Sequence, residues 1–170
     1  SGIGRGAALT FAAQGAKVVL ASRSQDANQE LLDEIHKNGG SAIFVKTDIT
    51  KTEDIAHMVK RTIAAYGKLD IAVNNAGVEG TPNVKTADYD EQVWDQVIDI
   101  NLKGVWLSMK YEIPELLKEG GGVIINISSL AGLQGGGAGI GYHASKFGVV
   151  GTTKATALEY AKDNLRVNAV

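Results

Sequence analysis

The stretch Leu69–Gly77, LDIAVNNAG, joins a short apolar run to a turn of amide and small side chains. Amphipathic stretches of helical length lie on either side of it, over Thr52–Tyr66 and Tyr89–Leu117. Short Val- and Ile-rich runs that alternate with helical stretches are typical of βα units around a parallel sheet. The sequence therefore predicts an α/β fold in which Leu69–Asn74 is a strand that ends at the NNAG turn.

The same alternation extends over the rest of the chain. Further strands are predicted at Lys17–Ala21, Ser41–Thr47, Val123–Ser128 and Arg166–Val170. Further helices are predicted at Gln25–Lys37, ended by Asn38-Gly39-Gly40, and at Gly141–Lys162. We expect Thr50 to cap the helix Thr52–Tyr66 with Glu53 as its partner three residues on. We also expect Pro114 to bend the end of the long helix.

Composition excludes several classes of function. The chain has 170 residues, 17 basic and 19 acidic side chains and a net charge of -2, which leaves no basic surplus for nucleic-acid binding. It has no cysteine, so disulfides, thiolate metal sites and a cysteine nucleophile are excluded. No apolar run approaches the roughly 18 residues of a membrane span. We expect a soluble, cytoplasmic protein with no membrane or nucleic-acid partner.

Other notable side chains have ordinary explanations. His36, His57 and His143 lack the spacing of metal ligands, so no metal is expected and each is interpreted as solvated or hydrogen-bonded. Trp94, Trp106, Met109 and Tyr111 are interpreted as helix packing or subunit contacts.

Six short motifs follow one another along the chain. They are SGIG before Arg5, Asp48 after a strand, NNAG at Asn74–Gly77, Asn101 in DINLKG, Ser128-Ser129, and Tyr142-x-x-x-Lys146. In this order they resemble the compact single-domain branch of the short-chain dehydrogenase/reductase family, over essentially the whole chain. The resemblance implies a doubly wound parallel sheet of Rossmann type in three α/β/α layers. Residues 1–170 would then form one dinucleotide-binding and catalytic domain, truncated at both ends.

The expectation that the chain is truncated rests on the residues at its two ends. Ser1–Gly4 resembles the second half of a glycine-rich phosphate loop with no strand before it, and Val170 ends inside an apolar strand. In a sheet of order 3-2-1-4-5-6, the missing first strand is central. The strands that begin at Lys17 and Leu69 would lose a common neighbour, so we expect the 170-residue chain alone to aggregate or partly unfold.

The resemblance also implies a dinucleotide site. Ser1, Gly2, Ile3 and Gly4 would bring a pyrophosphate to a helix N-terminus, where free N–H groups attract it. Ser22 and Arg23 follow the strand KVVLA, where an acid would bind the ribose of NAD.

No acid is present there, so Arg23 is predicted to pair with the 2′-phosphate of NADP. NADP(H) is therefore favoured, with NAD(H) as the alternative and an ordinary surface arginine as the competing interpretation.

Two further segments complete the implied cofactor site. Asp48, with Ile49 beside it, resembles the acid that binds the adenine amino group, and a plain turn aspartate is the alternative. Asn75, Ala76 and Gly77 would let the backbone approach the nicotinamide ribose. Asn74 is expected to tie adjacent strands together by bonding main-chain groups.

Tyr142 and Lys146, four residues apart, share one face of a helix, and Ser129 lies 13 residues before Tyr142. In the family, such a tyrosine is the general acid for ketone reduction and the general base for alcohol oxidation, assisted by the lysine ammonium. Ser129 would donate a hydrogen bond to the substrate oxygen. Lys146 would also hold the nicotinamide ribose. Asn101 resembles the fourth catalytic residue, which holds a water that relays protons through Lys146; a helix-bending polar residue is the alternative.

The expected function is an NADP(H)-dependent oxidoreductase that interconverts a ketone and a secondary alcohol, as a homodimer or homotetramer. A nucleotide-binding sensor on the same fold and a sugar-nucleotide epimerase or dehydratase are the alternatives. The substrate is not identified, although the run Gly135–Gly137 removes side chains from the near wall of the expected pocket. We expect Gly136→Leu to narrow the range of ketones accepted, and equal rates with small and large ketones would contradict this.

Overall fold

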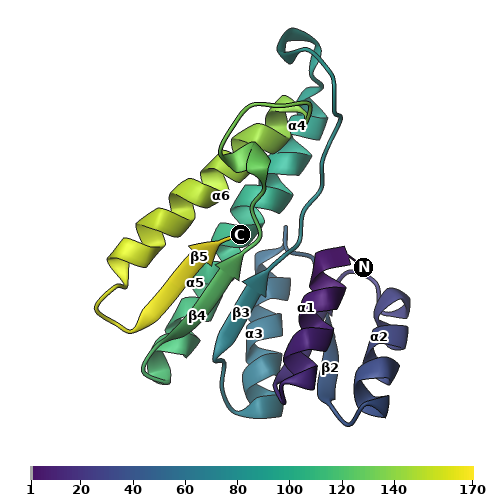
Figure 1. The fold of residues 1–170 in the computed structure, drawn as a ribbon, viewed down its shortest axis with the longest axis vertical. Coiled ribbons are helices and arrows are strands. Elements are labelled where there is room, and N and C mark those ends of the chain that lie inside the picture. The colour runs from purple at the N-terminus through teal and green to yellow at the C-terminus, as the bar shows by residue number, and fades with distance from the viewer. Residues whose placement is uncertain (1) are drawn as a thin grey trace. The chain divides into compact units, whose positions relative to one another are not determined.

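The computed structural model describes residues 2–170, apart from the side chain of Ala27. The chain divides into two compact units, which we call unit 1 (up to Gly67) and unit 2 (Lys68–Val170). Figure 1 labels the α-helices of both units and the strands β2 to β5. The expectation of a single domain over residues 1–170 stays a prediction.

Unit 1 is a two-stranded parallel sheet with three helices. Its elements are α1 (Gly2–Ala13), β1 (Lys17–Ser22), α2 (Asp26–Lys37), β2 (Ser41–Lys46) and α3 (Thr52–Tyr66). The strands pair in register from Lys17 opposite Ser41 to Ser22 opposite Lys46. Their carboxyl ends therefore lie side by side, and the residues that follow each strand meet at one edge.

The core of unit 1 is made by one face of each of α1, α2 and the sheet. Its buried members are Ala8, Ala12, Leu20, Leu31, Leu32, Ile35 and Ala42. Small alanines on α1 let this helix approach the sheet closely, while the larger Leu and Ile side chains of α2 fill the remaining space. Arg5 on α1 and Glu34 on α2 form an ion pair at the surface.

The predicted cap of α3 is wrong. The residue before the helix is Lys51, and it makes no side-chain capping bond. Thr50 instead donates its hydroxyl to Asp48 Oδ1 over 2.7 Å, and its N–H reaches the same oxygen over 3.0 Å. A carboxylate two residues upstream competes for a threonine in this way, since it closes an Asx turn. Thr50 is therefore part of a turn and not of the helix cap.

Unit 2 contains a three-stranded parallel sheet in the order β3-β4-β5. The elements are β3 (Ile71–Asn74), η1 (Thr86–Asp88), α4 (Glu91–Ile98), η2 (Asp99–Lys103), α5 (Gly104–Lys118), β4 (Gly122–Asn126), η3 (Leu130–Gly132), α6 (Ile140–Glu159) and β5 (Leu165–Ala169). Within each unit, the strand order agrees with the predicted sheet. The predicted alternation of parallel strands and helices is thus confirmed.

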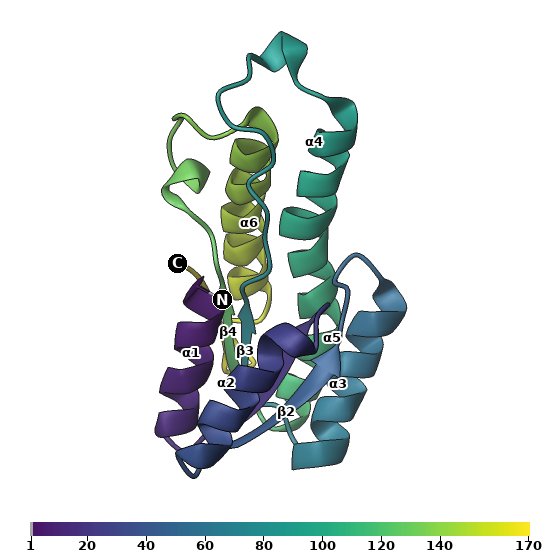
Figure 2. The same ribbon diagram turned by 90° about the vertical axis from the view of Figure 1, so that its right-hand side faces the viewer.

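The long helix predicted over Tyr89–Leu117 differs from the observed one in two respects. It begins at Glu91, because Asp90 caps it by accepting the N–H of Val93 over 3.0 Å. A π-helical segment, η2, then separates α4 from α5. Figure 2 shows α4 and α5 as one continuous column beside α6. In a π segment each hydrogen bond spans five residues, one more than in an α-helix, and such segments are frequent at functional sites.

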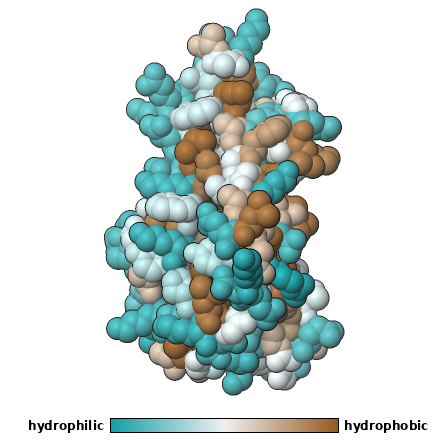
Figure 3. All heavy atoms as spheres, turned by 90° about the vertical axis from the view of Figure 1, so that its left-hand side faces the viewer, coloured by the Kyte–Doolittle hydropathy of each residue, from teal (hydrophilic) through white to brown (hydrophobic). Residues whose placement is uncertain are grey.

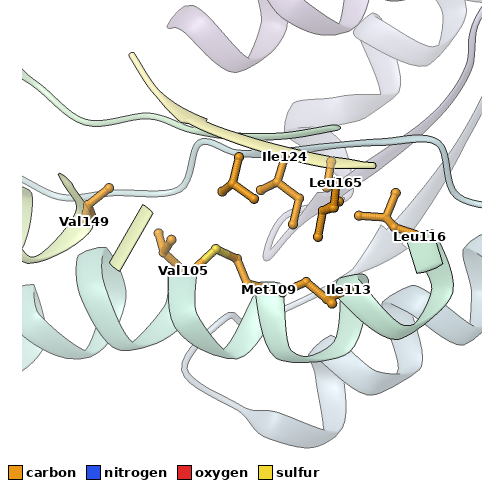
Figure 4. Close-up of a cluster of buried hydrophobic side chains, with 9 residues drawn as sticks. Val105, Met109, Ile113, Leu116, Ile124, Val149 and Leu165 are labelled. Atoms are coloured by element: carbon orange, nitrogen blue, oxygen red, sulfur yellow. The ribbon is translucent and has the colours of Figure 1, made fainter. Parts of the chain in front are cut away.

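The core of unit 2 lies between α5 and the sheet. The side chains of Val105, Met109 and Ile113 on α5 point toward the strands (Figure 4). Ile124 of β4 and Leu165 of β5 meet them from the other side. The predicted packing role of Met109 is confirmed, since only 2% of this residue is exposed.

Hydrophobic residues also reach the surface between hydrophilic ones (Figure 3). Trp94 and Trp106 are 37% and 49% exposed in this chain. The predicted role of these tryptophans in subunit contacts, and the dimer or tetramer itself, stay predictions. Among the described residues, no helix is long and apolar enough to cross a membrane.

Candidate active site

The residues predicted to bind the pyrophosphate open α1. Gly2, Ile3 and Gly4 form its first turn, and Gly2 has a φ of 56°, in the left-handed region that favours glycine. Ser1 lies outside the described residues. The free N–H groups of a first helical turn are suited to an anion, so these residues are compatible with the predicted role.

The residues predicted to select the cofactor lie at the carboxyl end of β1. Arg23 is exposed, and no hydrogen bond or ion pair joins its guanidinium to another described residue. Ser22, in contrast, uses its hydroxyl locally, since it donates to Ser24 O over 3.2 Å and accepts from Asn28 Nδ2 over 2.6 Å. Arg23 is therefore the better placed of the two to meet a phosphate.

Asp48 and the half-buried Ile49 follow β2. Two hydrogen bonds from Thr50 lower the pKa of the Asp48 carboxyl, and the charges of Lys51 and Arg23 add to this effect. Asp48 is thus anionic at neutral pH and able to accept a hydrogen bond. One of its oxygens, Oδ1, is already bonded to Thr50.

In unit 2, the NNAG turn lies against Asn101 and Lys146. A Cβ atom added to Gly77 would stand 3.4 Å from Asn101 Oδ1 and 3.7 Å from Lys146 Nζ. Asn75, Ala76 and Gly77 are half-buried or exposed. The absence of a side chain at Gly77 therefore keeps open the space beside both polar groups.

Asn101 is fully buried in η2. Its amide binds both main-chain groups of Val78, accepting the N–H over 2.8 Å and donating to the carbonyl over 2.8 Å. The second amide hydrogen goes to Ser145 Oγ over 3.1 Å. Asn101 thereby joins the segment after NNAG to α6.

Lys146 is a buried ammonium on α6, 3% exposed. Its Nζ donates to the carbonyl of Ile127 over 2.7 Å and lies 5.5 Å from the centre of the Tyr142 ring. Burial lowers the pKa of Lys146, and no carboxylate lies within ion-pair distance among the described residues. The phenol oxygen of the half-buried Tyr142 has no hydrogen-bond partner in residues 2–170.

Ser129 follows β4, one residue after the buried Ser128. Its Oγ accepts the N–H of Ala131 over 3.2 Å, and in the described part of the chain its own hydrogen is donated to no group. Ser128, in contrast, donates to the carbonyl of Lys146 over 3.3 Å. Ser128 therefore ties the segment after β4 to α6, whereas Ser129 keeps a donor available.

The sequence reasoning missed Ser145, which is completely buried. Its hydroxyl donates to the carbonyl of Tyr142 over 2.8 Å and accepts from Asn101. The signal available was its position, three residues after Tyr142 and directly before Lys146.

The expected bonding of Asn74 is wrong in detail. It does tie adjacent strands together, but through side chains: its amide donates to Asn126 Oδ1 over 3.0 Å and to Glu112 Oε2 over 3.1 Å. Asn126 in turn donates to Thr153 on α6 over 2.9 Å. The amide and carboxyl side chains are buried or half-buried here, so they find one another in place of main-chain groups that the sheet already uses.

Glu112 is the second buried ionisable group of unit 2, 4% exposed. Burial raises its pKa to about 7, and the hydrogen bond from Asn74 only partly opposes this. Glu112 thus holds the carboxyl end of β3 through Asn74, and its carboxyl group changes its charge near neutral pH.

The family model described as short chain dehydrogenase matches residues 1–170. The chain belongs to this family. The resemblance inferred from the six motifs is therefore confirmed.

Relatives of this short-chain dehydrogenase chain are named oxidoreductases. Cyclohexanol dehydrogenase of Acinetobacter sp. (strain SE19) is 44% identical over all 170 residues, which cover 67% of that protein. A 3-oxoacyl-acyl-carrier-protein reductase of Thermotoga maritima is 37% identical over the same residues, 68% of its length. An enzyme of the NAD(P)-dependent dehydrogenase and reductase class is confirmed at the level of the family.

Solved structures support the fold as well. A tryptophan variant of actinorhodin polyketide ketoreductase, crystallised with NADPH, matches 99% of this short-chain dehydrogenase chain with a TM-score of 0.94 and 35% identity. The match covers 65% of that chain. The predicted Rossmann-type, three-layer α/β/α fold is confirmed by this likeness. The chain spans about two thirds of the length of the relatives and structures it matches.

Proposed function

We propose that this protein is an NADP(H)-dependent oxidoreductase that transfers a hydride between the nicotinamide and a ketone or secondary alcohol. Asn101, Ser129, Tyr142 and Lys146 are its proposed catalytic set. One observation carries the proposal: two hydroxyls with no acceptor among the described residues, those of Ser129 and Tyr142, occur in one unit with a buried ammonium that lies beside the Tyr142 ring.

Tyr142 exchanges the proton with the substrate oxygen. Its phenol can give the proton to a ketone oxygen during reduction and take it back from an alcohol during oxidation. The Lys146 ammonium, 5.5 Å from the ring centre, stabilises negative charge that develops on the phenol oxygen. Such a proton-transfer group contributes a factor of about 10² to 10⁴ in rate.

Ser129 stabilises the charge on the substrate oxygen. Ala131 N–H binds one lone pair of Oγ and thereby limits the directions in which the hydroxyl hydrogen can point. A donor fixed in this way is ready before the charge develops, and removing such a donor costs about 10² to 10³ in rate.

Lys146 and Asn101 hold the centre together. Nζ uses one hydrogen for the Ile127 carbonyl, so its other hydrogens remain to bind the nicotinamide ribose. Asn101 donates both amide hydrogens within the protein, one to the Val78 carbonyl and one to Ser145 Oγ. A relay water would therefore meet the remaining lone pair of its Oδ1 or a main-chain carbonyl of η2.

Residues in each unit suit one part of a nicotinamide dinucleotide. Gly77 leaves open the space beside Lys146 Nζ that a Cβ would fill. The Arg23 guanidinium has no hydrogen bond or ion pair with a described residue, and no acidic side chain stands at Ser22-Arg23. A guanidinium binds a phosphate through two parallel hydrogen bonds, which favours NADP(H). When bound, the cofactor supplies or accepts the hydride.

The test uses the complete protein with one activated ketone, an α-keto ester, and compares NADPH with NADH. We expect faster turnover with NADPH, and we expect Arg23→Asp to shift the preference toward NADH by about tenfold or more. Arg61→Asp is the matched control, because Arg61 is an exposed arginine on α3 of the same unit.

The outcomes separate the parts of the proposal. A preference for NADH in the unaltered protein would discard the role of Arg23 and keep the reaction. Binding of either cofactor without turnover would contradict the enzyme and favour the nucleotide-binding sensor.

A further inference from the structure

His143 directly follows Tyr142 on α6, and its imidazole lies between two main-chain carbonyls. Nδ1 is 3.1 Å from the carbonyl oxygen of Ala131, and Nε2 is 3.2 Å from that of Gly136. Both carbonyls belong to residues 130–139, the segment that connects Ser129 to α6. One ring therefore bridges two points of this segment, and we call these two contacts the His143 bridge.

Each contact depends on a hydrogen-bond donor in the ring. A carbonyl oxygen only accepts, whereas a neutral imidazole has one N–H and one lone pair. Each ring nitrogen lies at hydrogen-bond distance from one carbonyl, and a nitrogen that carries a hydrogen donates it to that carbonyl. Residues 130–139 contain no ionisable side chain. Lys146, on the same helix, directs its Nζ to the Ile127 carbonyl.

The first contact of the bridge acts on Ser129. The N–H of Ala131 binds Ser129 Oγ over 3.2 Å, while the carbonyl of the same residue binds His143. A residue held at its carbonyl keeps its N–H in place, and this N–H limits the direction of the Ser129 hydroxyl. The ring of His143 is therefore linked to the proposed donor through a single residue.

The second contact acts on the glycine run. Gly135, Gly136 and Gly137 are exposed and have no side chains that could pack to hold the segment. The Gly136 carbonyl is held by His143, and the Gly137 carbonyl accepts the N–H of Asn83 over 3.3 Å. Without these contacts, a run of three glycines has large conformational freedom.

We propose that His143 is a positioning residue: through Ala131 it orients the Ser129 hydroxyl, and through Gly136 it fixes the wall of the ketone site. This inference rests on the proposed ketone reduction. It assigns to the two ring nitrogens two separable effects, one on the chemical step and the other on substrate binding.

Two substitutions separate these effects. In His143→Asn, the amide nitrogen takes about the place of Nδ1, so the Ala131 contact remains and the Gly136 contact is lost. We expect kcat close to the unaltered value and a KM for the ketone about tenfold higher. In His143→Gln, the amide nitrogen takes about the place of Nε2. We expect the reverse, a kcat about tenfold lower with little change in KM.

His143→Phe keeps a ring and loses both contacts, so it should show both effects while the affinity for NADPH stays unchanged. His57→Phe is the matched control, because His57 is exposed on α3. Equal changes in the Asn and Gln variants, in proportion to a lower melting temperature, would overturn the inference. Unchanged kinetics in all three variants would also overturn it.

Hydrogen–deuterium exchange gives a measurement that does not depend on turnover. We expect exchange across residues 130–139 to be faster in His143→Phe than in the unaltered protein and in His57→Phe. Unchanged exchange would overturn the bridge even if the enzyme is active. Faster exchange in a protein without ketone turnover would instead contradict the proposed function and leave the bridge in place.

Discussion

The predicted cofactor-selecting residues of unit 1 and the proposed catalytic residues of unit 2 are held in different ways. In unit 1, Arg23 is exposed, and the carboxylate of Asp48 is bonded to Thr50, two residues away in the sequence. In unit 2, Asn101 is buried and binds Val78 and Ser145, which are 23 and 44 residues away. The first set depends on local turns, whereas the second depends on contacts between separate elements.

This difference has a consequence for substitutions. An exposed side chain with few partners can change the ligand preference at little cost in folding, because surface changes usually alter stability by about 0.5 kcal/mol or less. Buried polar groups that bind one another affect stability and activity together. The following predictions, from the largest effect to the smallest, test where this division holds.

Tyr142→Phe should have the largest effect, on activity alone. The substitution removes the phenol oxygen and keeps the ring beside Lys146. We expect kcat to fall by about 10² to 10⁴, with unchanged NADPH affinity and melting temperature. Tyr111→Phe on α5 serves as the control. A variant that keeps full turnover would remove Tyr142 from the reaction.

Glu112→Gln should change stability in a pH-dependent way. The folded pKa of about 7 lies above the ordinary value of 4.5. Between these values the folded protein binds a proton that the unfolded chain has released, so stability falls as pH rises through this window. Above it, the loss amounts to about 3 kcal/mol at most. The glutamine can still accept the Asn74 hydrogen bond and carries no charge, so it should remove this slope.

Urea unfolding at pH 5, 6, 7 and 8 measures the effect. The control is Glu115→Gln, because Glu115 forms a surface ion pair with Lys118 on the same helix. Such pairs contribute about 1 kcal/mol or less. Parallel stability curves for the unaltered protein and Glu112→Gln would show that the Glu112 carboxyl does not titrate in this window.

Gly77→Ala should weaken cofactor binding and leave the fold intact. The new methyl group would stand 3.4 Å from Asn101 Oδ1, an ordinary contact, and φ at this position is not left-handed. It would fill the space proposed for the nicotinamide ribose, so we expect the Kd for NADPH to rise about tenfold. Gly6→Ala, where the Cβ meets nothing, is the control. An unchanged Kd in calorimetry would place the ribose elsewhere.

Arg23→Asp should have the smallest effect on stability. Its guanidinium is exposed and forms no hydrogen bond or ion pair with another described residue, so the melting temperature should shift by no more than about 2 °C. Differential scanning calorimetry without cofactor checks this. A large loss of stability would show that the cofactor-selecting part is as closely tied to the fold as unit 2.

Much of the fold could be predicted because apolar periodicity is a local property. The predicted strands and the ends of α2 and α3 agree with the structure to within about two residues. The π segment was not predictable, since the apolar pattern of Asp99–Lys103 does not distinguish it from an α-helix. The motifs identified Asn101 as a site residue, but they could not identify Val78 as its partner. Glu112 was missed because the groups that bury it and bind it are distant in the sequence.

The single π turn at η2 also sets a limit on changes in chain length. One additional residue in a helix rotates everything after it by about 100°. The extra residue of η2 therefore sets which face of α5 packs on the sheet when α4 packs on α6. Deleting one residue between Asp99 and Lys103 would restore a regular helix and move Asn101 away from Val78. The number of residues between Asp99 and Lys103 is therefore as much a requirement of the site as the identity of Asn101.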